Sequence, residues 1–533
     1  MALVIGLYVV AGVWLALYGL NGLVLAGLYL YHRHDRMRQP TCQPSRYPLV
    51  TVQLPIFNER YVIERLIDAV AGLDWPRDRL QIQILDDSAD ETTTLALARV
   101  EHLKQRGFDI ALIRRLDRSG YKAGALAVGL TYARGEFIAV FDADFIPPPG
   151  FLRQTIPAFL DRPQLGMVQT RWAHLNADYS LLTRAQSLAL DGHFVVEQTA
   201  RNRSGLLMNF NGTAGVWRRT CIEASGGWSD DTLSEDLDLS YRAQLAGWDC
   251  LYLPEVSAPA ELTPQLAAFK RQQFRWAKGS IQCLLKLWPA LVEKGHQPSN
   301  ATGTRNALHV REHGGPLSPR RLTAGQKAAA LVHLSSYLAH PLMLVLLLCS
   351  LPLFLSPRHT HLPMALAYLG FSSLGPPLVY ALGQRALYPD WRRRVLVFPL
   401  LALLGTGIAL NNTRAVIEAL SGQRGPFVRT PKFQLEGRTG RWADSAYRLS
   451  LDWSTLGEAA LALYAVITMV AAWQAGNLYA IPFLLLYAGG FGLTAGLGAW
   501  QAWALPQSWS RLRMIPGKRR PTRGASRVIE TRS

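Results

Sequence analysis

The segment Val140-Phe-Asp-Ala-Asp-Phe145 places two aspartates directly after a short apolar run, Phe137–Val140. Such a run is typical of a buried strand, and ligands of open α/β sheets bind beyond the carboxyl ends of the strands. Carboxylates two residues apart at a strand end suit one hard cation, Mg²⁺ or Mn²⁺, because these ions prefer oxygen ligands. An isolated Asp-x-Asp pair is a weak signal, but the flanking phenylalanines and the strand end strengthen it. We therefore take Asp142 and Asp144 as candidate metal ligands.

The residues around this segment, from 48 to about 255, alternate short apolar or β-branched runs with amphipathic stretches. This alternation predicts a mainly parallel sheet with helices on both faces. The expected strands are Leu49–Leu54, Gln81–Leu85, Ile110–Ile113, Phe137–Phe141 and Gly166–Gln169. The expected helices lie near 58–72, 91–106, 121–134 and 150–160.

Two further acidic motifs lie in the same α/β region. Leu85-Asp-Asp-Ser88 follows a strand-like run, so Asp87 is either a ligand at a strand end or part of a solvated turn. Ser234-Glu-Asp236 offers a carboxylate, Asp236, that is suited to accept the proton of an attacking hydroxyl. The same residues also fit a helix N-cap with an acidic first turn, and taken alone the motif favours that structural explanation.

A motif of mixed character, Gln272-Gln-Phe-Arg-Trp276, lies in an amphipathic, basic stretch from about 262 to 294. Arg275 can bind a diphosphate through two parallel hydrogen bonds. The face of Trp276 can stack against the apolar side of a sugar ring. Alternatively, both residues are ordinary anchors of a helix that lies flat at a membrane surface.

Composition excludes several classes of protein. With 49% apolar and 18% charged residues, the chain can form a core, which excludes extensive disorder. Its five cysteines are widely spaced without a Cys-x-x-Cys pair, which excludes a disulfide scaffold. Most of the net charge of +18 lies in residues 301–533, which hold 25 basic and 8 acidic residues. These basic residues flank long apolar runs, which is typical of membrane topology and not of nucleic-acid binding.

Apolar runs at both ends of the chain predict membrane spans. Residues 2–31 carry no charge, and the basic segment 32–38 that follows places the N-terminus outside and residue 32 onward in the cytoplasm. Further apolar runs lie near 328–356, 363–384, 395–411, 456–474 and 477–504. Five crossings there would place the basic loop 421–448 and the basic tail 505–533 outside. We therefore assign about 390–420 to the membrane interface and expect four C-terminal spans.

In combination, the motifs resemble one known family. They occur in the order D…DxD…(T/S)ED…QxxRW beside membrane helices, as in the membrane-integrated family 2 glycosyltransferases, which include cellulose, chitin and hyaluronan synthases. The resemblance covers about 48–290 and points in particular to the cellulose-synthase-like mannan and glucan synthases. It is carried by VQLPIFNER (52–60), ILDDSAD (84–90), GYKAGAL (120–126), VFDADF (140–145), FNGTAGVWR (210–218) and QQFRWAKGS (272–280).

The resemblance implies a fold and a division of the chain. The fold is an α/β GT-A-type nucleotide-binding domain joined to a polytopic α-helical membrane domain. The expected units are an N-terminal transmembrane helix (1–31), the GT-A glycosyltransferase domain (48–255), amphipathic interface helices with QxxRW (256–300), a linker (301–327), a C-terminal transmembrane region (328–504) and a basic cytoplasmic tail (505–533). The catalytic domain is expected in the cytoplasm, in an integral protein of the plasma membrane.

The resemblance also implies roles for individual residues. Asp236 corresponds to the general base, while Asp142 and Asp144 correspond to the pair that binds a Mg²⁺ or Mn²⁺ ion and the diphosphate. The implied substrate-binding residues are Pro55, Phe57, Glu59, Asp87, Lys122, Phe210, Gly212, Thr213, Glu235, Gln272, Arg275 and Trp276.

The segment Phe427-Val-Arg-Thr-Pro-Lys432 resembles the gating loop F-x-V-T-x-K of cellulose synthases. The residues that match this pattern are Phe427, Thr430 and Lys432. The chain departs from the pattern at Arg429, where the family has valine, so the contacts of this loop cannot simply be carried over.

Three hypotheses of function follow. The first is an inverting, processive hexosyltransferase that polymerises a β-linked mannan, glucomannan or glucan from GDP-mannose or UDP-glucose and extends a growing glycan at the bilayer. The second is transfer of a single sugar to a membrane lipid. The third, a transporter or scaffold, is disfavoured because the apolar runs are nearly free of ionisable residues and no acidic position of the motifs is lost. The donor sugar, the linkage and the oligomeric state remain open.

Overall fold

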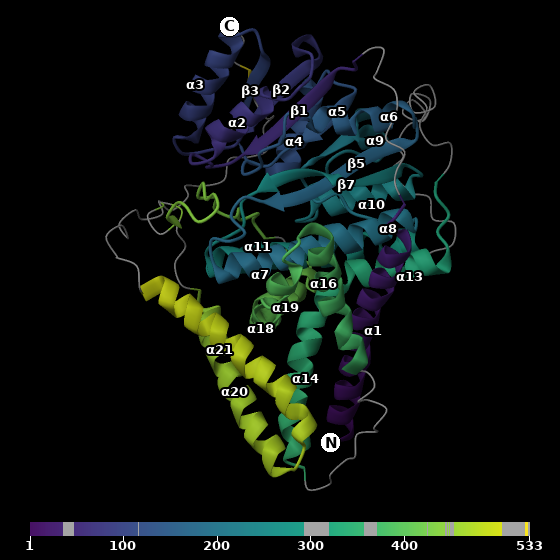
Figure 1. Ribbon diagram of the computed structural model, residues 1–533, viewed down its shortest axis with the longest axis vertical. Helices are drawn as coiled ribbons and strands as arrows, with labels where there is room; N and C mark the ends of the chain where they lie inside the picture. Colours follow the sequence, from purple (N-terminus) through teal and green to yellow (C-terminus); the bar gives the residue numbers. More distant parts are fainter. Residues whose placement is uncertain are drawn as a thin grey trace.

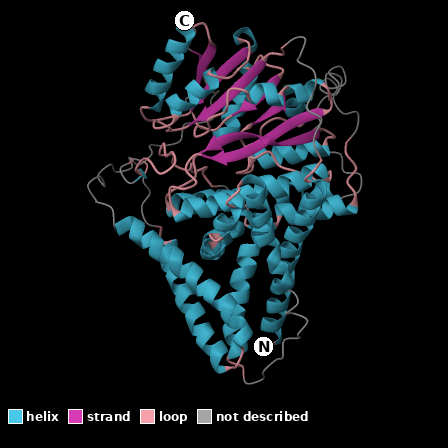
Figure 2. Cartoon of the chain, in the orientation of Figure 1, coloured by secondary structure: helices cyan, strands magenta, loops and turns pink. Residues whose placement is uncertain are grey.

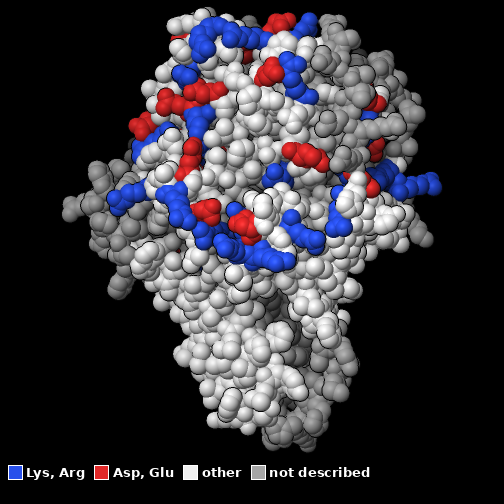
Figure 3. Space-filling view, in the orientation of Figure 1, with Lys and Arg blue, Asp and Glu red and all other residues white. Residues whose placement is uncertain are grey.

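The computed structural model describes residues 1–35, 47–115, 117–292, 319–356, 370–423, 425–442, 445, 447, 452–503 and 528–530. Within these residues an α/β domain sits on a layer of amphipathic helices, and a set of apolar helices extends from the other side of that layer (Figures 1 and 2). Figure 3 shows the same division in the charges, since the apolar helices present an almost uncharged surface below a band of Lys and Arg side chains.

A mixed sheet with the strand order β7-β5-β6-β4-β1-β2-β3-β8 forms the α/β domain. Its strands are β1 (Val50–Ile56), β2 (Leu80–Asp86), β3 (Asp109–Arg115), β4 (Phe137–Val140), β5 (Leu165–His174), β6 (Gly215–Arg218), β7 (Asp249–Ala260) and β8 (Val528–Glu530). β4, β1, β2 and β3 are parallel, and β6 runs antiparallel to both β4 and β5. The parallel strands bring the ends of β1, β2 and β4 to one edge, where the acidic motifs begin.

Helices cover both faces of the sheet, as predicted. On one face lie α2 (Ile63–Ala71), α3 (Thr92–Gln105) and α5 (Phe151–Thr155), and on the other lie α4 (Tyr121–Tyr132), α9 (Arg219–Ala224) and α10 (Glu235–Leu245). Each face buries its own apolar core, because successive side chains of a strand point to opposite sides. The predicted GT-A-like α/β fold is therefore confirmed.

Several predicted boundaries differ from the structure. The strand β7 continues past the expected domain end at 255, because its residues up to Ala260 pair with the end of β5. One helix, α11 (Leu266–Val292), takes the place of the expected interface helices. Within the expected linker 301–327, residues 301–318 lie outside the described residues. Helix α13 (Ala324–Leu334) begins inside it, where the Thr323 hydroxyl accepts a hydrogen bond from the Gln326 N–H in a capping box.

Among the described residues, four helices are long and apolar enough to cross a membrane. They are α1 (Ala2–His32), the segment Ser336–Phe354 that contains α14 (Ala339–Phe354), α20 (Ser454–Gln474) and the segment Leu478–Ala502 within which α21 (Ile481–Trp503) begins. The expected span 363–384 lies partly outside the described residues, and its described part holds the short 3-10 helix η4 (Gly370–Leu374) and the helix α16 (Gly375–Leu387). The segment that we assigned to the membrane interface is a helix pair, Trp391–Gly407 and Ala409–Leu420, bent by 44°.

Candidate active site

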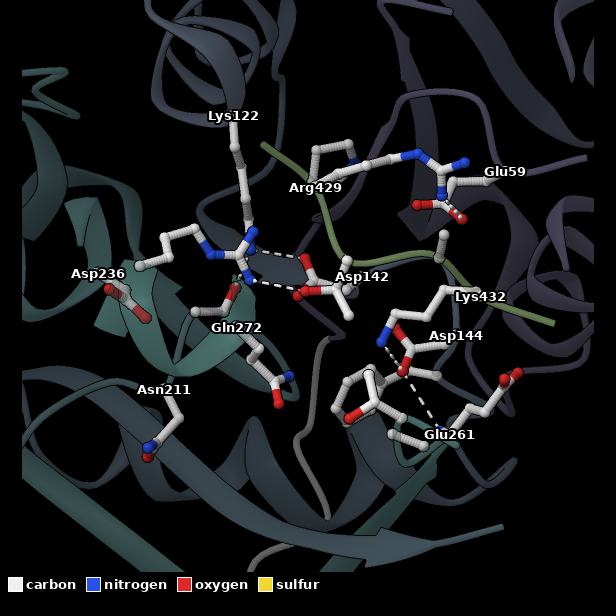
Figure 4. A pocket seen from close by; sticks show the side chains of 18 of the residues that line it. Glu59, Lys122, Asp142, Asp144, Asn211, Asp236, Glu261, Gln272, Arg429 and Lys432 are labelled. Atoms are coloured by element: carbon white, nitrogen blue, oxygen red, sulfur yellow. Dashed lines mark hydrogen bonds and ion pairs between the residues drawn. The ribbon is translucent and has the colours of Figure 1, made fainter. Parts of the chain in front are cut away.

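A pocket of about 190 Å³ opens at the edge of the sheet where β1, β2 and β4 end (Figure 4). Sixteen of the predicted residues line it: Pro55, Phe57, Glu59, Asp87, Lys122, Asp142, Asp144, Gly212, Glu235, Asp236, Gln272, Arg275, Trp276, Phe427, Thr430 and Lys432. Six separate regions of the chain thus meet in one cavity: the strand ends, the start of α4, the loop before β6, the start of α10, the helix α11 and a segment that precedes α20.

Two other predicted residues do not line this pocket. Phe210 is fully buried and packs edge-to-face against Trp217, with ring centroids 5.4 Å apart, so it belongs to the core. Thr213 is also buried, and its hydroxyl accepts a hydrogen bond of 2.9 Å from the backbone N–H of Asp142. Their roles as substrate-binding residues stay predictions, and the contact that the structure shows for Thr213 positions the first aspartate of the Asp-x-Asp motif.

At one end of the pocket, Asp87 is held by Arg115. The Arg115 Nε donates to Asp87 Oδ1 over 2.8 Å, and the guanidinium makes a second contact with the other oxygen. Burial raises the pKa of Asp87, an effect that the ion pair with Arg115 opposes. Nearby, the guanidinium of Arg118 lies 3.4 Å from the centre of the Phe57 ring. An aromatic face, a cation and a carboxylate can together bind a flat, polar heterocycle such as a nucleobase.

The two aspartates of the Asp-x-Asp motif each have a lysine partner. Lys122 Nζ lies 2.5 Å from Asp142 Oδ1, and Lys432 Nζ lies 2.6 Å from Asp144 Oδ2. Burial by itself lowers the pKa of Lys122, but Asp142 and Glu235 outweigh it, and the pKa is raised above its usual value. The backbone N–H of Glu261 approaches the same oxygen of Asp144 at 3.3 Å.

The donor set fits a divalent cation that is completed by a ligand. Among the described residues, no group of three or more His, Cys, Asp or Glu side chains forms a ready metal site. Mg²⁺ is commonly held by one or two carboxylates together with substrate phosphates, so Asp142 and Asp144 meet the requirement once a diphosphate is present. Lys122 and Lys432 meanwhile neutralise carboxylates that would otherwise repel each other.

Asp236 occupies a different setting at the start of α10. Its pKa is raised to about 7 by burial and by the neighbouring Glu235, while Lys122 opposes the shift. Gly212 has φ +81°, and a Cβ at this position would lie 2.8 Å from Asp236 Oδ2, so glycine leaves room for the carboxylate. The Ser234 hydroxyl makes no capping bond to the helix, although Ser234 is the N-cap residue. The purely structural explanation of this motif thus loses its main support.

The segment 425–435, which we name the strap, lines the pocket through Phe427, Arg429, Thr430 and Lys432. Phe427 lies under the guanidinium of Arg275, 4.4 Å from the ring centre, and Lys432 reaches Asp144 as described. Arg429 Nη1 lies 3.1 Å from Glu59 Oε2, and burial raises the pKa of Glu59 to about 8 even though Arg429 opposes it.

Glu261 anchors the strap and was not predicted from the sequence. Its carboxylate accepts hydrogen bonds from the backbone N–H of Phe433 at 2.9 Å and of Leu435 at 3.2 Å. Burial raises its pKa to about 7. The residue follows β7 with no motif around it, and only the pairing of β7 with β5 brings it to the pocket. No sequence signal therefore marks it.

Comparison with known proteins agrees with this geometry. Residues 48–279 match the family model described as "Glycosyltransferase like family 2". Residues 48–279 are therefore similar to a family 2 glycosyltransferase domain.

Curated relatives extend the match. "Glucomannan 4-beta-mannosyltransferase 1" of Oryza sativa subsp. japonica is 44% identical over 257 residues, which are 48% of this chain and 49% of the relative. "Glucomannan 4-beta-mannosyltransferase 2" of Arabidopsis thaliana is 44% identical over 252 residues, 46% of this chain and 47% of the relative. The chain thus spans about half the length of the curated relatives it matches.

A solved structure supports the fold. A mannosyltransferase from Pyrobaculum calidifontis, in complex with GDP-Man and Mn²⁺, superposes with a TM-score of 0.51 at 18% identity. The match covers 78% of this chain and 100% of that one.

Proposed function

We propose that the protein is an inverting, processive hexosyltransferase that builds a β-linked mannan, glucomannan or glucan from GDP-mannose or UDP-glucose. One observation carries the proposal: Asp236 and the Asp142–Asp144 pair face the same pocket, which Trp276 also lines. A base, a diphosphate site and a sugar platform are the parts that glycosyl transfer needs. The similarity to the glucomannan mannosyltransferases supports mannose as one donor sugar.

The chain's own residues account for the chemistry. Asp236 accepts the proton of the acceptor hydroxyl as that oxygen attacks the anomeric carbon, and its raised pKa suits proton transfer near neutral pH. Arg275 and Lys122 stabilise the negative charge that develops on the diphosphate leaving group. A Mg²⁺ or Mn²⁺ ion held by Asp142 and Asp144 would add to this stabilisation. A single displacement inverts the anomeric centre, so an α-linked donor gives a β-linkage.

We further propose that the catalytic domain, the loop 421–448 and the tail 505–533 all lie in the cytoplasm, in a protein of the plasma membrane. The strap supports this arrangement, because Lys432 contacts Asp144 and must share its side of the bilayer. The antiparallel pairing of β8 with β3 supports it for the end of the tail. We keep 390–420 at the membrane interface, and the 44° bend between Trp391–Gly407 and Ala409–Leu420 supports this, because it suits a segment that does not cross the bilayer as one straight helix.

Purified full-length protein offered GDP-mannose, UDP-glucose or UDP-N-acetylglucosamine in separate reactions tests the function. With GDP-mannose or UDP-glucose we expect a β-linked polymer, identified by linkage analysis and by digestion with a β-specific glycanase. A product that stays in the organic phase with one sugar per lipid would contradict processive synthesis and support a glycolipid synthase. Release of free sugar alone would contradict both.

A further inference from the structure

A second cavity, which we name the rear cavity, lies behind the strap. Its volume is about 440 Å³, larger than that of the active-site pocket, and within the range of small-molecule sites. It is enclosed by α11, by α19 and by the ends of α20 and α21 that lie toward the α/β domain. Its polar and charged lining residues are Gln265, Lys270, Arg271, Arg275, Lys278, Asn411, Arg414, Glu418, Asp452, Thr455 and Gln501.

The strap is the partition between the two cavities. Phe427 and Arg429 line the active-site pocket, whereas Gly425, Pro426 and Val428 line the rear cavity. Alternate residues of an extended segment point to opposite sides, so a group in the rear cavity bears directly on the back of the strap.

Arg275 joins the two cavities, since it lines both. Its guanidinium lies over the Phe427 ring at 4.4 Å, and its Nη2 lies 3.5 Å from Thr430 Oγ1. A ligand in the rear cavity would therefore contact Arg275 itself, which is the arginine proposed to bind the diphosphate in the other cavity.

The lining of the rear cavity is electropositive. Five cationic side chains line it together with the carboxylates of Glu418 and Asp452, and Glu458 pairs with Lys270 from outside the lining, which leaves an excess of two positive charges. The inner cations are compensated: Lys278 Nζ lies 2.8 Å from Glu418 Oε2, and Lys270 Nζ lies 2.5 Å from Glu458 Oε1. Apart from Arg275, which also lines the active-site pocket, the excess is thus left to the outer part of the lining.

Two exposed arginines carry that excess. Arg271 has no ion pair within 4.0 Å among the described residues, although Asp452, which also lines the cavity, interacts with it electrostatically. Arg414 shares Glu418 with Lys278, its side chain remains 65% exposed, and its guanidinium lies 5.3 Å from the centre of the Phe274 ring. An anion that enters the cavity from outside contacts these two guanidinium groups first. The planar guanidinium group matches the geometry of a phosphate better than an ammonium group does.

The cavity also lies at the level expected for lipid headgroups. Trp453, which lines it, is 85% exposed and immediately precedes the apolar span α20. Tryptophan is enriched at the membrane–water interface. Figure 3 shows the band of Lys and Arg side chains at this same boundary, above the uncharged helices.

We propose that the rear cavity binds the phosphate headgroup of an anionic lipid, held by Arg271 and Arg414, and that the bound headgroup supports the strap over the donor. The binding follows from the cavity alone, whereas its effect on transfer rests on the proposed function. The acyl chains remain in the bilayer beside α20, so only the headgroup enters, which agrees with a cavity of about 440 Å³.

The test uses full-length protein in nanodiscs of phosphatidylcholine alone or with phosphatidylglycerol. Lipid retained by the protein is measured by native mass spectrometry, and sugar transfer is measured in parallel. We expect wild type to retain phosphatidylglycerol and to transfer sugar several-fold faster in its presence. The double variant Arg271→Gln/Arg414→Gln should lose both responses and keep the phosphatidylcholine rate. The matched control Arg392→Gln/Arg393→Gln, which removes two exposed arginines of α17 (Trp391–Val395), should keep both.

Equal retention and equal activation in wild type and the Arg271→Gln/Arg414→Gln variant would overturn the proposal. So would a stimulation by inorganic phosphate or glycerol 1-phosphate in pure phosphatidylcholine that depends on the same two arginines, because the ligand would then be a soluble anion. Loss of retention in the control variant would show a general surface effect and would also overturn it. If no variant transfers sugar, the retention measurement still decides the binding, so failure of the proposed function is distinguishable.

Discussion

The two ends of the active-site pocket keep their carboxylates in contrasting electrostatic settings. At the diphosphate end, Asp142 and Asp144 each contact a lysine, at 2.5 and 2.6 Å. At the other end, Asp236 forms no ion pair with a described residue and stands beside Glu235, which helps to raise its pKa to about 7. Each aspartate of the first pair has a lysine partner, while Asp236 is poised to take a proton.

The difference teaches how one pocket serves two tasks with the same side-chain type. Carboxylates bind a cation in their charged form, and an opposite charge nearby favours that form. A general base works best when its pKa lies near the working pH, which burial and a like charge bring about. Substitutions at the two ends should therefore fail in different ways.

The largest effect is expected from Asp236→Asn. The amide preserves the shape of the side chain but cannot accept the proton, so transfer should fall by about 10²–10⁴-fold. Binding of the nucleotide, followed by calorimetry, should stay within about twofold of wild type because the diphosphate end is untouched.

The pH profile of wild type gives an independent check of the same assignment. Because the pKa of Asp236 is raised to about 7, transfer should decline as the pH falls through this value and the base becomes protonated. In the residual activity of Asp236→Asn, this decline at low pH should disappear. Transfer by the variant within tenfold of wild type would remove Asp236 from the role of base.

A smaller but still large effect is expected from Asp144→Ala. The variant removes one of the two oxygen ligands, so the response of transfer to added Mg²⁺ or Mn²⁺ should disappear, with a loss of about 10²-fold. Titration of the metal at fixed donor concentration measures this. Glu261→Gln serves as the control, since it alters a strap anchor beside Asp144 and leaves both aspartates intact. Full wild-type activity in excess EDTA would contradict the metal assignment.

Much of the fold was readable from the sequence. The strands β1 to β5 are apolar runs between amphipathic segments, so their positions followed from periodicity alone. The strands β6 and β7 were missed, because β6 has only two apolar residues between a glycine and an arginine and β7 contains Pro254 and Pro259. The helix α2 begins at Ile63 and not near 58, since Asn58 takes a left-handed φ of +56° and its backbone bonds to Ser88.

The sequence predicted the site residues that lie in short local motifs. It did not predict the contacts that only the folded chain creates. Asp142, Asp236 and Arg275 each lie in a short motif whose residue types point to their chemistry. The contact of Lys432 with Asp144 joins residues 288 positions apart, and only the folded strap creates it. The same holds for Glu261, which no neighbouring residue marks. Phe210 was misplaced because a motif records which residues occur together and not which side of the backbone each side chain takes.

The smallest effect is expected from Arg429→Val, which restores the residue of the gating-loop pattern. Arg429 pairs with Glu59 at 3.1 Å, and its guanidinium lies 4.1 Å from the centre of the Tyr447 ring. Both side chains of the ion pair are largely buried, so the valine leaves a buried carboxylate without its partner. Because burial already raises the pKa of Glu59 to about 8, protonation at neutral pH limits the cost.

We therefore expect Arg429→Val to raise the KM for the donor by about three- to tenfold, which is at most about 1.4 kcal/mol, with a smaller change in kcat. Steady-state kinetics over a range of donor concentrations measures both. Arg429→Lys keeps the positive charge, so its KM for the donor should lie between those of wild type and Arg429→Val. In the Arg429→Val background, Glu59→Gln should cost less than it does in wild type, because the two side chains act as a pair. Additive losses would show that Arg429 supports the strap through Tyr447 alone, and an unchanged KM would mean that the strap closes without this ion pair.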